Sequence, residues 1–316
     1  MANFELDRKI FLHGVDIGRR LRALRNRHTA YVYSDLSLVF RNDSRRDPLK
    51  TVLAVCIGWI DRYYSGYGLT PWYKSGVKLT SVVIEDDVQP ENTASWFSYQ
   101  SNLVDVKLGS RIETIGASMF TSCAALPSIV IPDSVTTIQS YAFERCTSLL
   151  SVTMSRNVET IARDAFYYTA IRSVNLPETL HTLGYGAFRY CPNLNSITLP
   201  EAVTVVPDSC FSNCTGLVQV HIGSHTTTLS KYAFYSCSSL EYITIPASVT
   251  ELIGNTFAGC TSLKGIIFED PKGWWYTSDV DATSGTSVNF SNYTNNINYL
   301  VTAYGSTYYN YYFRKS

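Results

Sequence analysis

Two cysteines and two histidines lie close together in the chain, and side chains of these types bind zinc. Cys210 and Cys214 are followed by His221 and His225, which gives one C-x-x-x-C pair and one H-x-x-x-H pair. Only six residues separate Cys214 from His221, whereas zinc fingers of this ligand type need about twelve or more. The spacing therefore predicts no zinc site, and we expect no other metal site.

Carboxylates are the remaining candidates for catalysis. Glu85, Asp86 and Asp87 form an acidic cluster, and Asp279 and Asp281 form a pair. Exposed acidic loops are usually only solvated, and nothing in the sequence indicates a raised pKa in either group. The sequence contains no nucleophile elbow, H-E-x-x-H pair or phosphate-binding loop. We therefore expect no catalytic residues, no cofactor and no enzyme activity; the alternative is an unusual enzyme site in the segment before residue 79.

A leucine or isoleucine returns at a nearly constant interval along most of the chain. The spacings are 22 to 24 residues, and a phenylalanine recurs at the same interval. The positions are Leu79, Leu103, Leu126, Leu149, Ile171, Leu194, Leu217, Leu240 and Leu263, with Phe97, Phe120, Phe143, Phe166, Phe188, Phe211, Phe234 and Phe257. Such a period is typical of a leucine-rich-repeat solenoid. We predict a mainly β solenoid whose coils each contain a strand, a short second strand and one helical turn.

Each repeat begins with an alternating segment of the form L-x-x-V-x-L/I. The apolar residues of such a strand point inward and the residues between them point outward. A proline often follows, where it turns the chain without removing a ladder hydrogen bond. We predict that the outward residues, called here the outward strip, bind the ligand; they include Asp105, Lys107, Ser151, Thr153, Ser173, Asn175, Ser196, Thr198, Gln219, His221, Tyr242 and Thr244. Gln219, His221 and Tyr242 supply the larger donors and the aromatic surface, and the alternative is an ordinary solvated sheet face.

Six cysteines occupy equivalent positions, three residues after a repeat phenylalanine. They are Cys123, Cys146, Cys191, Cys214, Cys237 and Cys260. Stacked coils lie about 4.8 Å apart, but side chains that project in parallel into a core lack the dihedral angle of a disulfide. We therefore predict a structural ladder of buried free thiols.

The block A-F-x-x-C-x-S-L, as in SVTTIQSYAFERCTSLLSV, resembles the BspA-like bacterial surface-antigen branch of leucine-rich repeats. The resemblance covers about residues 79–268 and is specific, because the block recurs with few departures. Gln100 and Thr169 replace the cysteine, and Ile171 follows a one-residue deletion, which predicts local kinks in the stack. The resemblance implies a binding or adhesion role and brings no catalytic residues.

The chain divides into a nonrepeat region at 1–70, the solenoid at 71–268 and an aromatic-rich end at 269–316. Residues 17–28 predict a solvated amphipathic helix, with docking to an acidic partner or lipid as the alternative. Residues 31–43 and 51–64 predict strands that close the solenoid, because its terminal core must be capped. The C-terminal end predicts a β-rich cap. Alternatively, its aromatics form an oligomer contact or a carbohydrate platform; they include Tyr308, Tyr309, Tyr311 and Tyr312.

Composition and charge argue against two classes of protein, nucleic-acid binders and membrane-spanning proteins. The formal net charge is zero and 45% of residues are hydrophobic, which indicates a folded chain without the basic surface of a nucleic-acid binder. No segment approaches the roughly 20 apolar residues of a membrane span, and residues 1–20 contain no signal-peptide core, so we expect no signal peptide.

The expected function is a non-enzymatic recognition or adhesion module that binds a host or partner protein, or a glycan. The sequence favours a place on a bacterial surface or a phage-like particle, and the two caps are candidate oligomer contacts. The alternative is a cytoplasmic scaffold for protein–protein interaction.

Overall fold

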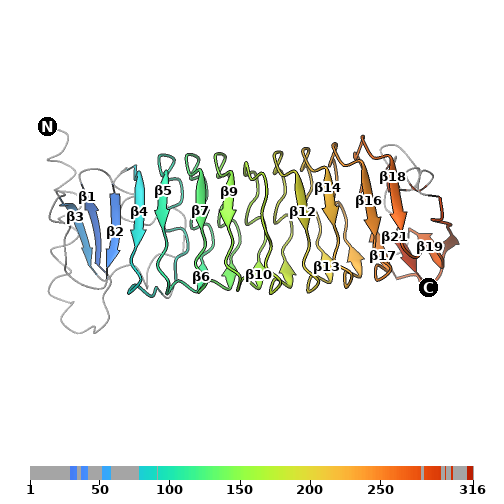
Figure 1. Ribbon diagram of the computed structural model, residues 1–316, viewed down its shortest axis with the longest axis horizontal. Coiled ribbons are helices and arrows are strands. Elements are labelled where there is room, and N and C mark those ends of the chain that lie inside the picture. The colour runs from blue at the N-terminus through green and yellow to red at the C-terminus, as the bar shows by residue number, and fades with distance from the viewer. Residues whose placement is uncertain are drawn as a thin grey trace.

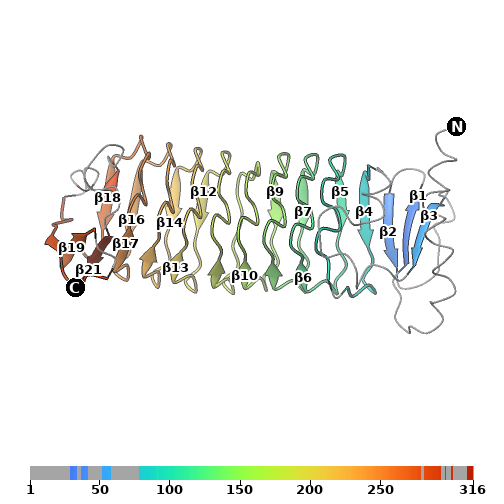
Figure 2. The same cartoon turned by 180° about the vertical axis from the view of Figure 1, so that it is seen from behind.

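The computed structural model describes residues 29–33, 37–41, 52–57, 78–90, 92–278, 281–292, 296, 300–301 and 312–315. These residues form a rod of stacked coils, with β1–β3 at one end and β19–β21 at the other (Figure 1). Figure 2 shows the same order of coils from behind. The predicted mainly β solenoid with its repeat of about 23 residues is confirmed. The arginine-rich helix predicted at 17–28 lies outside the described residues.

The first side of each coil is a short strand that runs parallel to its neighbours. This first ladder contains β4 Ser81–Ile84, β5 Asp105–Lys107, β7 Ser128–Val130, β9 Ser151–Thr153, β12 Ser196–Thr198, β14 Gln219–His221, β16 Tyr242–Ile245 and β18 Gly265–Phe268. After the one-residue deletion, the strand is reduced to a single bridge between Ser151 and Ser173. The ladder is therefore irregular at the coil where the deletion predicts a kink.

The second side is a ladder of two- and three-residue strands. It contains β6 Thr114–Ile115, β8 Thr137–Ile138, β10 Thr160–Ile161, β11 Thr182–Leu183, β13 Val205–Val206, β15 Thr228–Leu229 and β17 Glu251–Ile253. A turn at the proline leads into it, as where the N–H of Val135 donates to the carbonyl of Pro132 at 2.9 Å. The prolines therefore turn the chain between the two ladders, as the sequence predicts.

The third segment of each coil consists of successive turns, which differs from the predicted helical turn. Two residues around each repeat phenylalanine have positive φ, such as Ser118 at 55° and Ser122 at 60° on either side of Phe120. A right-handed helix has negative φ throughout. The N–H of Phe120 donates to the carbonyl of Ala142 in the next coil at 2.8 Å. The backbone here bonds to the neighbouring coil, and the left-handed residues turn these N–H groups toward it.

The repeat phenylalanines and cysteines fill the core. Neighbouring phenylalanine rings from Phe97 to Phe257 stack with centroids 5.2 to 5.7 Å apart. The thiol of Cys146 donates to the carbonyl of Phe120 in the preceding coil at 3.1 Å, and the other ladder cysteines repeat this contact. Burial raises the pKa of Cys146 to about 12. The predicted ladder of buried free thiols is confirmed.

Three strands continue the first ladder at the N-terminal end. They are β1 Thr29–Tyr33, β2 Ser37–Arg41 and β3 Val52–Ile57. β1 pairs antiparallel with β2 and β3, and β2 runs parallel to β4. Leu38 on β2 is part of the solenoid core. The segments 31–43 and 51–64 therefore contain strands, as predicted.

At the other end, three antiparallel strands extend the second ladder. They are β19 Trp274–Thr277, β20 Thr286–Ser287 and β21 Tyr312–Lys315. β21 lies between β17 and β19, and Arg314 forms an ion pair with Glu251 of β17 at 3.0 Å. β21 thereby covers the edge of β17, which would otherwise be open to pairing with another chain. The domain boundaries given by the sequence stay predictions.

Candidate functional site

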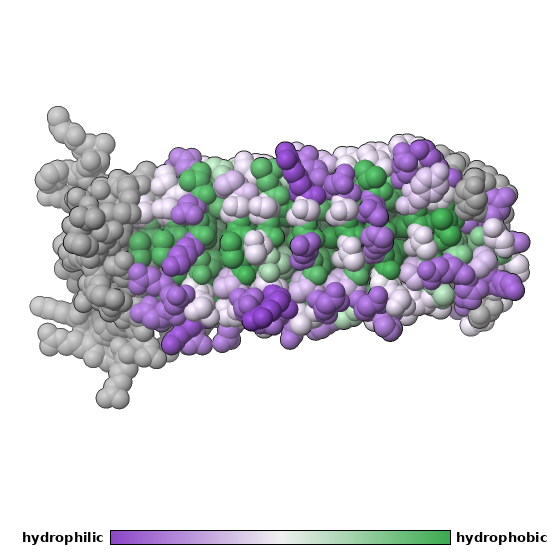
Figure 3. Space-filling view, viewed as in Figure 1, coloured by the Kyte–Doolittle hydropathy of each residue, from purple (hydrophilic) through white to green (hydrophobic). Residues whose placement is uncertain are grey.

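All twelve residues of the outward strip are exposed. They lie on β5, β9, β12, β14 and β16, and on the bridged segment between β9 and β12. The residue between each pair points inward, as Ile197 does between Ser196 and Thr198. Figure 3 shows one face of the rod: apolar residues form a band along its length, and polar side chains lie across the band and on both sides. The alternation in sequence therefore gives the correct sides of these strands.

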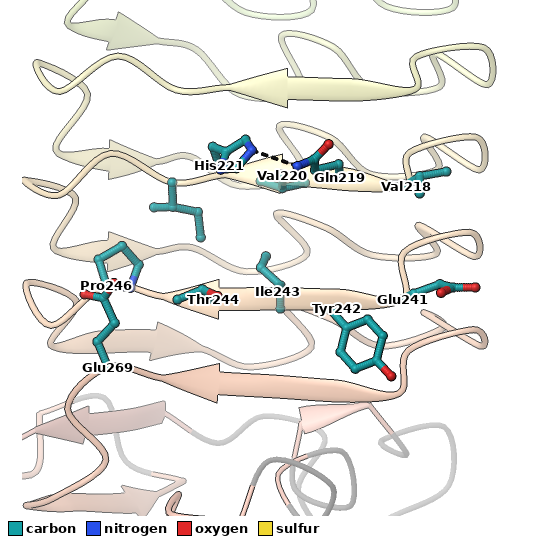
Figure 4. Close-up of a pocket in the computed structure, with 11 residues that line it drawn as sticks. Val218, Gln219, Val220, His221, Glu241, Tyr242, Ile243, Thr244, Pro246 and Glu269 are labelled. Carbon is teal, nitrogen blue, oxygen red and sulfur yellow. Dashed lines mark hydrogen bonds between the residues drawn. The ribbon is translucent and has the colours of Figure 1, made fainter.

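The first ladder is interrupted at several places, and one of them is between β14 and β16. Within the described residues, β14 pairs with β12 and β16 pairs with β18, but no ladder joins β14 to β16. A hollow of about 560 Å³ lies over this seam. It is lined by Val218, Gln219, Val220, His221, Ile222, Glu241, Tyr242, Ile243, Thr244, Pro246 and Glu269. Gln219, His221 and Tyr242 of the outward strip all line this hollow, with the Tyr242 ring on the β18 side of β16 (Figure 4).

The hollow combines a buried apolar part with exposed polar side chains. Val220 and Ile243 are 7% and 2% exposed, whereas the ring of Tyr242 is half exposed. Figure 4 shows Gln219 and His221 on β14, and Tyr242 on the adjacent strand β16. This combination of an apolar base, an aromatic ring and a few placed polar groups is typical of ligand sites.

Gln219 and His221 are hydrogen-bonded to each other on the rim. The Gln219 Nε2 atom lies 2.9 Å from the His221 Nε2 atom. With the amide nitrogen as the donor, the Nε2 atom of the imidazole accepts, which corresponds to the tautomer with its proton on Nδ1. The amide oxygen of Gln219 and the Nδ1–H of His221 form no hydrogen bond with any described residue. The pair therefore offers one acceptor and one donor to a ligand in the hollow.

Two glutamates that the strip does not include bring carboxylates to the hollow. Glu241 forms an ion pair with Lys264 at 2.9 Å, and this hydrogen bond raises the pKa of the Lys264 ammonium. Glu269 accepts the N–H of Ala247 at 3.0 Å. Both glutamates flank strands, at positions outside the inward and outward alternation, so the alternation could not indicate them. With these carboxylates, the hollow suits a hydroxyl- or amide-bearing ligand better than an anion.

The cysteines and histidines that resemble a zinc site do not converge. Cys210 and Cys214 are fully buried, whereas His221 and His225 are exposed. His225 instead lies 3.1 Å from the carboxylate of Glu201. In the part of the chain that the structure describes, no group of three or more histidine, cysteine or acidic side chains is placed to hold a metal ion.

The structure describes the acidic cluster Glu85, Asp86 and Asp87, but only Asp281 of the acidic pair. The carboxylate of Asp86 accepts the N–H of Ser110 at 2.9 Å, and this bond lowers its pKa. A general acid needs the opposite shift. Asp279 lies outside the described residues.

Across the described ranges, no helix has the length and hydropathy to cross a bilayer.

Several solved structures are similar to this chain over part of its length. A leucine-rich repeat protein from Bacteroides ovatus is 24% identical with a TM-score of 0.51, over 60% of this chain and 55% of that one. The chain thus spans about half the length of that relative, and the likeness shows the fold. A leucine-rich repeat protein from T. pallidum is 28% identical with a TM-score of 0.47, over 63% and 87% of the two chains. A leucine-rich cell surface protein from Faecalibacterium prausnitzii is 20% identical with a TM-score of 0.40, over 83% and 97%.

Sequence comparison identifies the repeats. No curated protein matches the chain. The family model of the BspA type leucine-rich repeat region matches residues 72–195 and 181–305, with six copies. These two matches cover the solenoid and more than half of the chain, so this protein belongs to the family with BspA-type leucine-rich repeats.

Proposed function

We propose that this protein is a non-enzymatic recognition module that binds a glycan or a polypeptide in the hollow between β14 and β16. The observation that carries the proposal is that Gln219, His221 and the half-exposed Tyr242 line one hollow together with the buried apolar residues Val220 and Ile243. The ring supplies contact area with few rotatable bonds. The amide and imidazole supply directional hydrogen bonds that can distinguish one hydroxyl or amide pattern from another.

The stacked coils support this role because they hold the site rigidly. Each coil of a solenoid is fixed by its neighbours, and repeat proteins bind through the extended surfaces that result. The side chains of the hollow come from two successive strands of such a stack. Little conformational entropy is then lost in the protein when the ligand binds.

The test is a binding screen of the full chain on an array of oligosaccharides and against a displayed peptide library. The variants Tyr242→Ala and Gln219→Ala should weaken binding of any hit at least about tenfold, as residues at the centre of an interface do. Both side chains are exposed, so the free energy of unfolding should change by less than about 0.5 kcal/mol. The matched control is Thr153→Ala, which changes the outward strip on β9, away from the hollow.

Four outcomes separate the possibilities. Loss of binding in the two hollow variants alone supports the site. Equal loss in the Thr153 variant moves binding to the whole outward strip, and unchanged binding in all three removes the strip from the proposal. A chain that binds neither probe set contradicts the recognition role through this face.

We further propose that the protein acts on a bacterial surface or a phage-like particle, where an adhesion module meets its host. The test is to quantify its peptides in washed cell surfaces, released particles and cytosol of the source culture. Confinement to the cytosol would contradict adhesion and favour an internal protein partner.

A further inference from the structure

Tyrosine and arginine side chains gather on the third segment of two successive coils. The coils are those of Phe166 and Phe188, and the gathered residues are called here the tyrosine–arginine patch. It consists of Arg163, Tyr167, Tyr168, Tyr185, Arg189 and Tyr190. The N–H of Tyr168 donates to the carbonyl of Arg189 at 3.0 Å. The patch therefore lies on backbone segments that are hydrogen-bonded to each other, on a different side of the coils from the outward strip.

A buried carboxylate lies within ion-pair distance of both arginines. The side chain of Asp164 is 3% exposed; its Oδ2 atom lies 3.2 Å from Nε of Arg163, and its Oδ1 atom lies 3.3 Å from Nη2 of Arg189. The equivalent position of the next coil is Gly186, with φ of +60°, and a β-carbon there would lie 2.4 Å from Asp164 Oδ1. The glycine leaves the space that the carboxylate occupies. Two coils thus differ from the repeat pattern together, in a way that anchors the patch.

Tyrosine rings cover the two guanidinium groups. The guanidinium carbon of Arg189 lies 4.5 Å from the ring centroid of Tyr167, and that of Arg163 lies 4.6 Å from the ring centroid of Tyr185. A cation is attracted to the face of an aromatic ring at these distances. The arginines are therefore held in place before any partner arrives, which lowers the entropy lost on binding.

The exposed side of the patch is positively charged. The side chain of Arg163 is 57% exposed, whereas its counterion Asp164 is buried. Tyr168 and Tyr190 are 50% and 39% exposed, and the Tyr190 ring centroid lies 5.9 Å from the guanidinium carbon of Arg189. The patch therefore presents a cation and apolar ring surface to solvent, and its charge is complementary to carboxylates.

The angles between the rings favour a polypeptide over a sugar. The ring of Tyr167 stands at 84° to that of Tyr190 and at 62° to that of Tyr168, and the two exposed rings, Tyr168 and Tyr190, meet at 36°. The three rings are therefore not coplanar and do not form one flat platform for stacking a sugar. Tyrosine and arginine are also the residue types that contribute most to binding at protein–protein interfaces.

We propose that the tyrosine–arginine patch is a second binding surface, and that its partner is an acidic polypeptide segment with apolar side chains between its carboxylates. Arg163 pairs with the carboxylates, and the rings of Tyr168 and Tyr190 contact the apolar side chains. The patch and the hollow lie on different sides of the coils. The protein can therefore bind two partners at the same time.

The experiment uses the full chain and two fluorescent probes, poly-L-glutamate and a glutamate–tyrosine copolymer, with fluorescence anisotropy as the readout. The wild-type chain should bind the copolymer more tightly than poly-L-glutamate, and added salt should weaken both. The variant Arg163→Glu should weaken both probes by about tenfold, because it replaces an attractive charge by a repulsive one. The double variant Tyr168→Ser, Tyr190→Ser should lose the preference for the copolymer.

The matched controls change the same residue types outside the patch. Arg156→Glu makes the same charge change at an exposed site. Tyr99→Ser makes the same substitution at the repeat position of Tyr168 and Tyr190, also exposed and with positive φ. Serine occupies that position at Ser122 and Ser236, so the serine variants should fold. Both controls should bind the probes within about twofold of the wild type.

Several results would overturn the proposal. One is failure of both probes to bind the wild-type chain, and another is equal weakening by the control variants and the patch variants. A third is binding of heparin that depends on Arg163 while the copolymer does not bind, which would assign the patch to an anionic glycan. Because the hollow residues are unchanged in all these variants, loss of this surface is distinguishable from loss of the proposed function.

Discussion

Replacing Phe166 by alanine should destabilise the solenoid by about 4–5 kcal/mol. The ring is fully buried and stacks on both sides, with centroids 5.2 Å from Phe143 and 5.2 Å from Phe188 and with interplanar angles of 5° and 7°. Truncation of a buried phenylalanine costs about 3–5 kcal/mol, and aromatic pairs contribute about 0.5–1.5 kcal/mol each beyond the area they bury. Loss of two pairs at once places this variant in the upper half of that range.

The assay is urea unfolding followed by circular dichroism, with Val130→Ala as the control because this side chain is 62% exposed. The control should change the free energy of unfolding by less than about 0.5 kcal/mol. In a stack where each coil contacts only its neighbours, a defect at Phe166 also separates the coils on its two sides. The slope of the unfolding free energy against urea should therefore fall. A loss below about 1 kcal/mol with an unchanged slope would refute the view that the phenylalanine stack couples the coils.

Three other perturbations have expected outcomes. Iodoacetamide at neutral pH should leave Cys146 unmodified until urea is added, which peptide mass spectrometry can check; rapid labelling of the native protein would contradict this. The free energy of unfolding should fall as the pH rises above 9.0 toward about 12, because burial raises the pKa of the folded-state thiol and only the unfolded thiol ionises in that range. Unfolding measured at several pH values checks the second outcome. Gly186→Ala should cost about 2 kcal/mol or more, because φ is positive and the new carbon meets Asp164; an unchanged melting temperature would contradict the close approach. Phe313→Asp should release β21 and promote self-association through the edge of β17. Light scattering after gel filtration measures the self-association. A monomer of unchanged stability would contradict the view that β21 covers the edge of β17.

The sequence predicts the repeat, its period and the sides of its strands because these features are local. A strand alternates every second residue, so the exposed pair Ser196 and Thr198 around Ile197 can be assigned without coordinates. The stack of phenylalanines and the ladder of cysteines follow from one repeated position each. A solenoid places equivalent residues of successive coils one above the other, so the period alone brings them together.

The candidate site is predictable only in part. Gln219, His221 and Tyr242 are indicated by alternation and size, but the position of the hollow, over the seam where no ladder joins β14 to β16, is not. Glu241 joins it from outside the alternating segment. The helical turn predicted for the third segment fails because the competing hydrogen bonds run to the next coil. Local pattern contains no information about that competition.

The sequence by itself determined that this chain stacks coils of about 23 residues, which side of each strand faces solvent, and which cysteines and phenylalanines fill the core, because each of these depends on the spacing of neighbours along the chain. Only the tertiary structure decided where the stack opens into a hollow. It also decided that the ring centroids of Tyr167 and Tyr190 lie 5.8 Å apart, and that Arg314 donates a hydrogen bond to Glu251, 63 residues away in the sequence. These contacts depend on small offsets between coils and on the return of a distant strand. Spacing along the chain does not specify either of them.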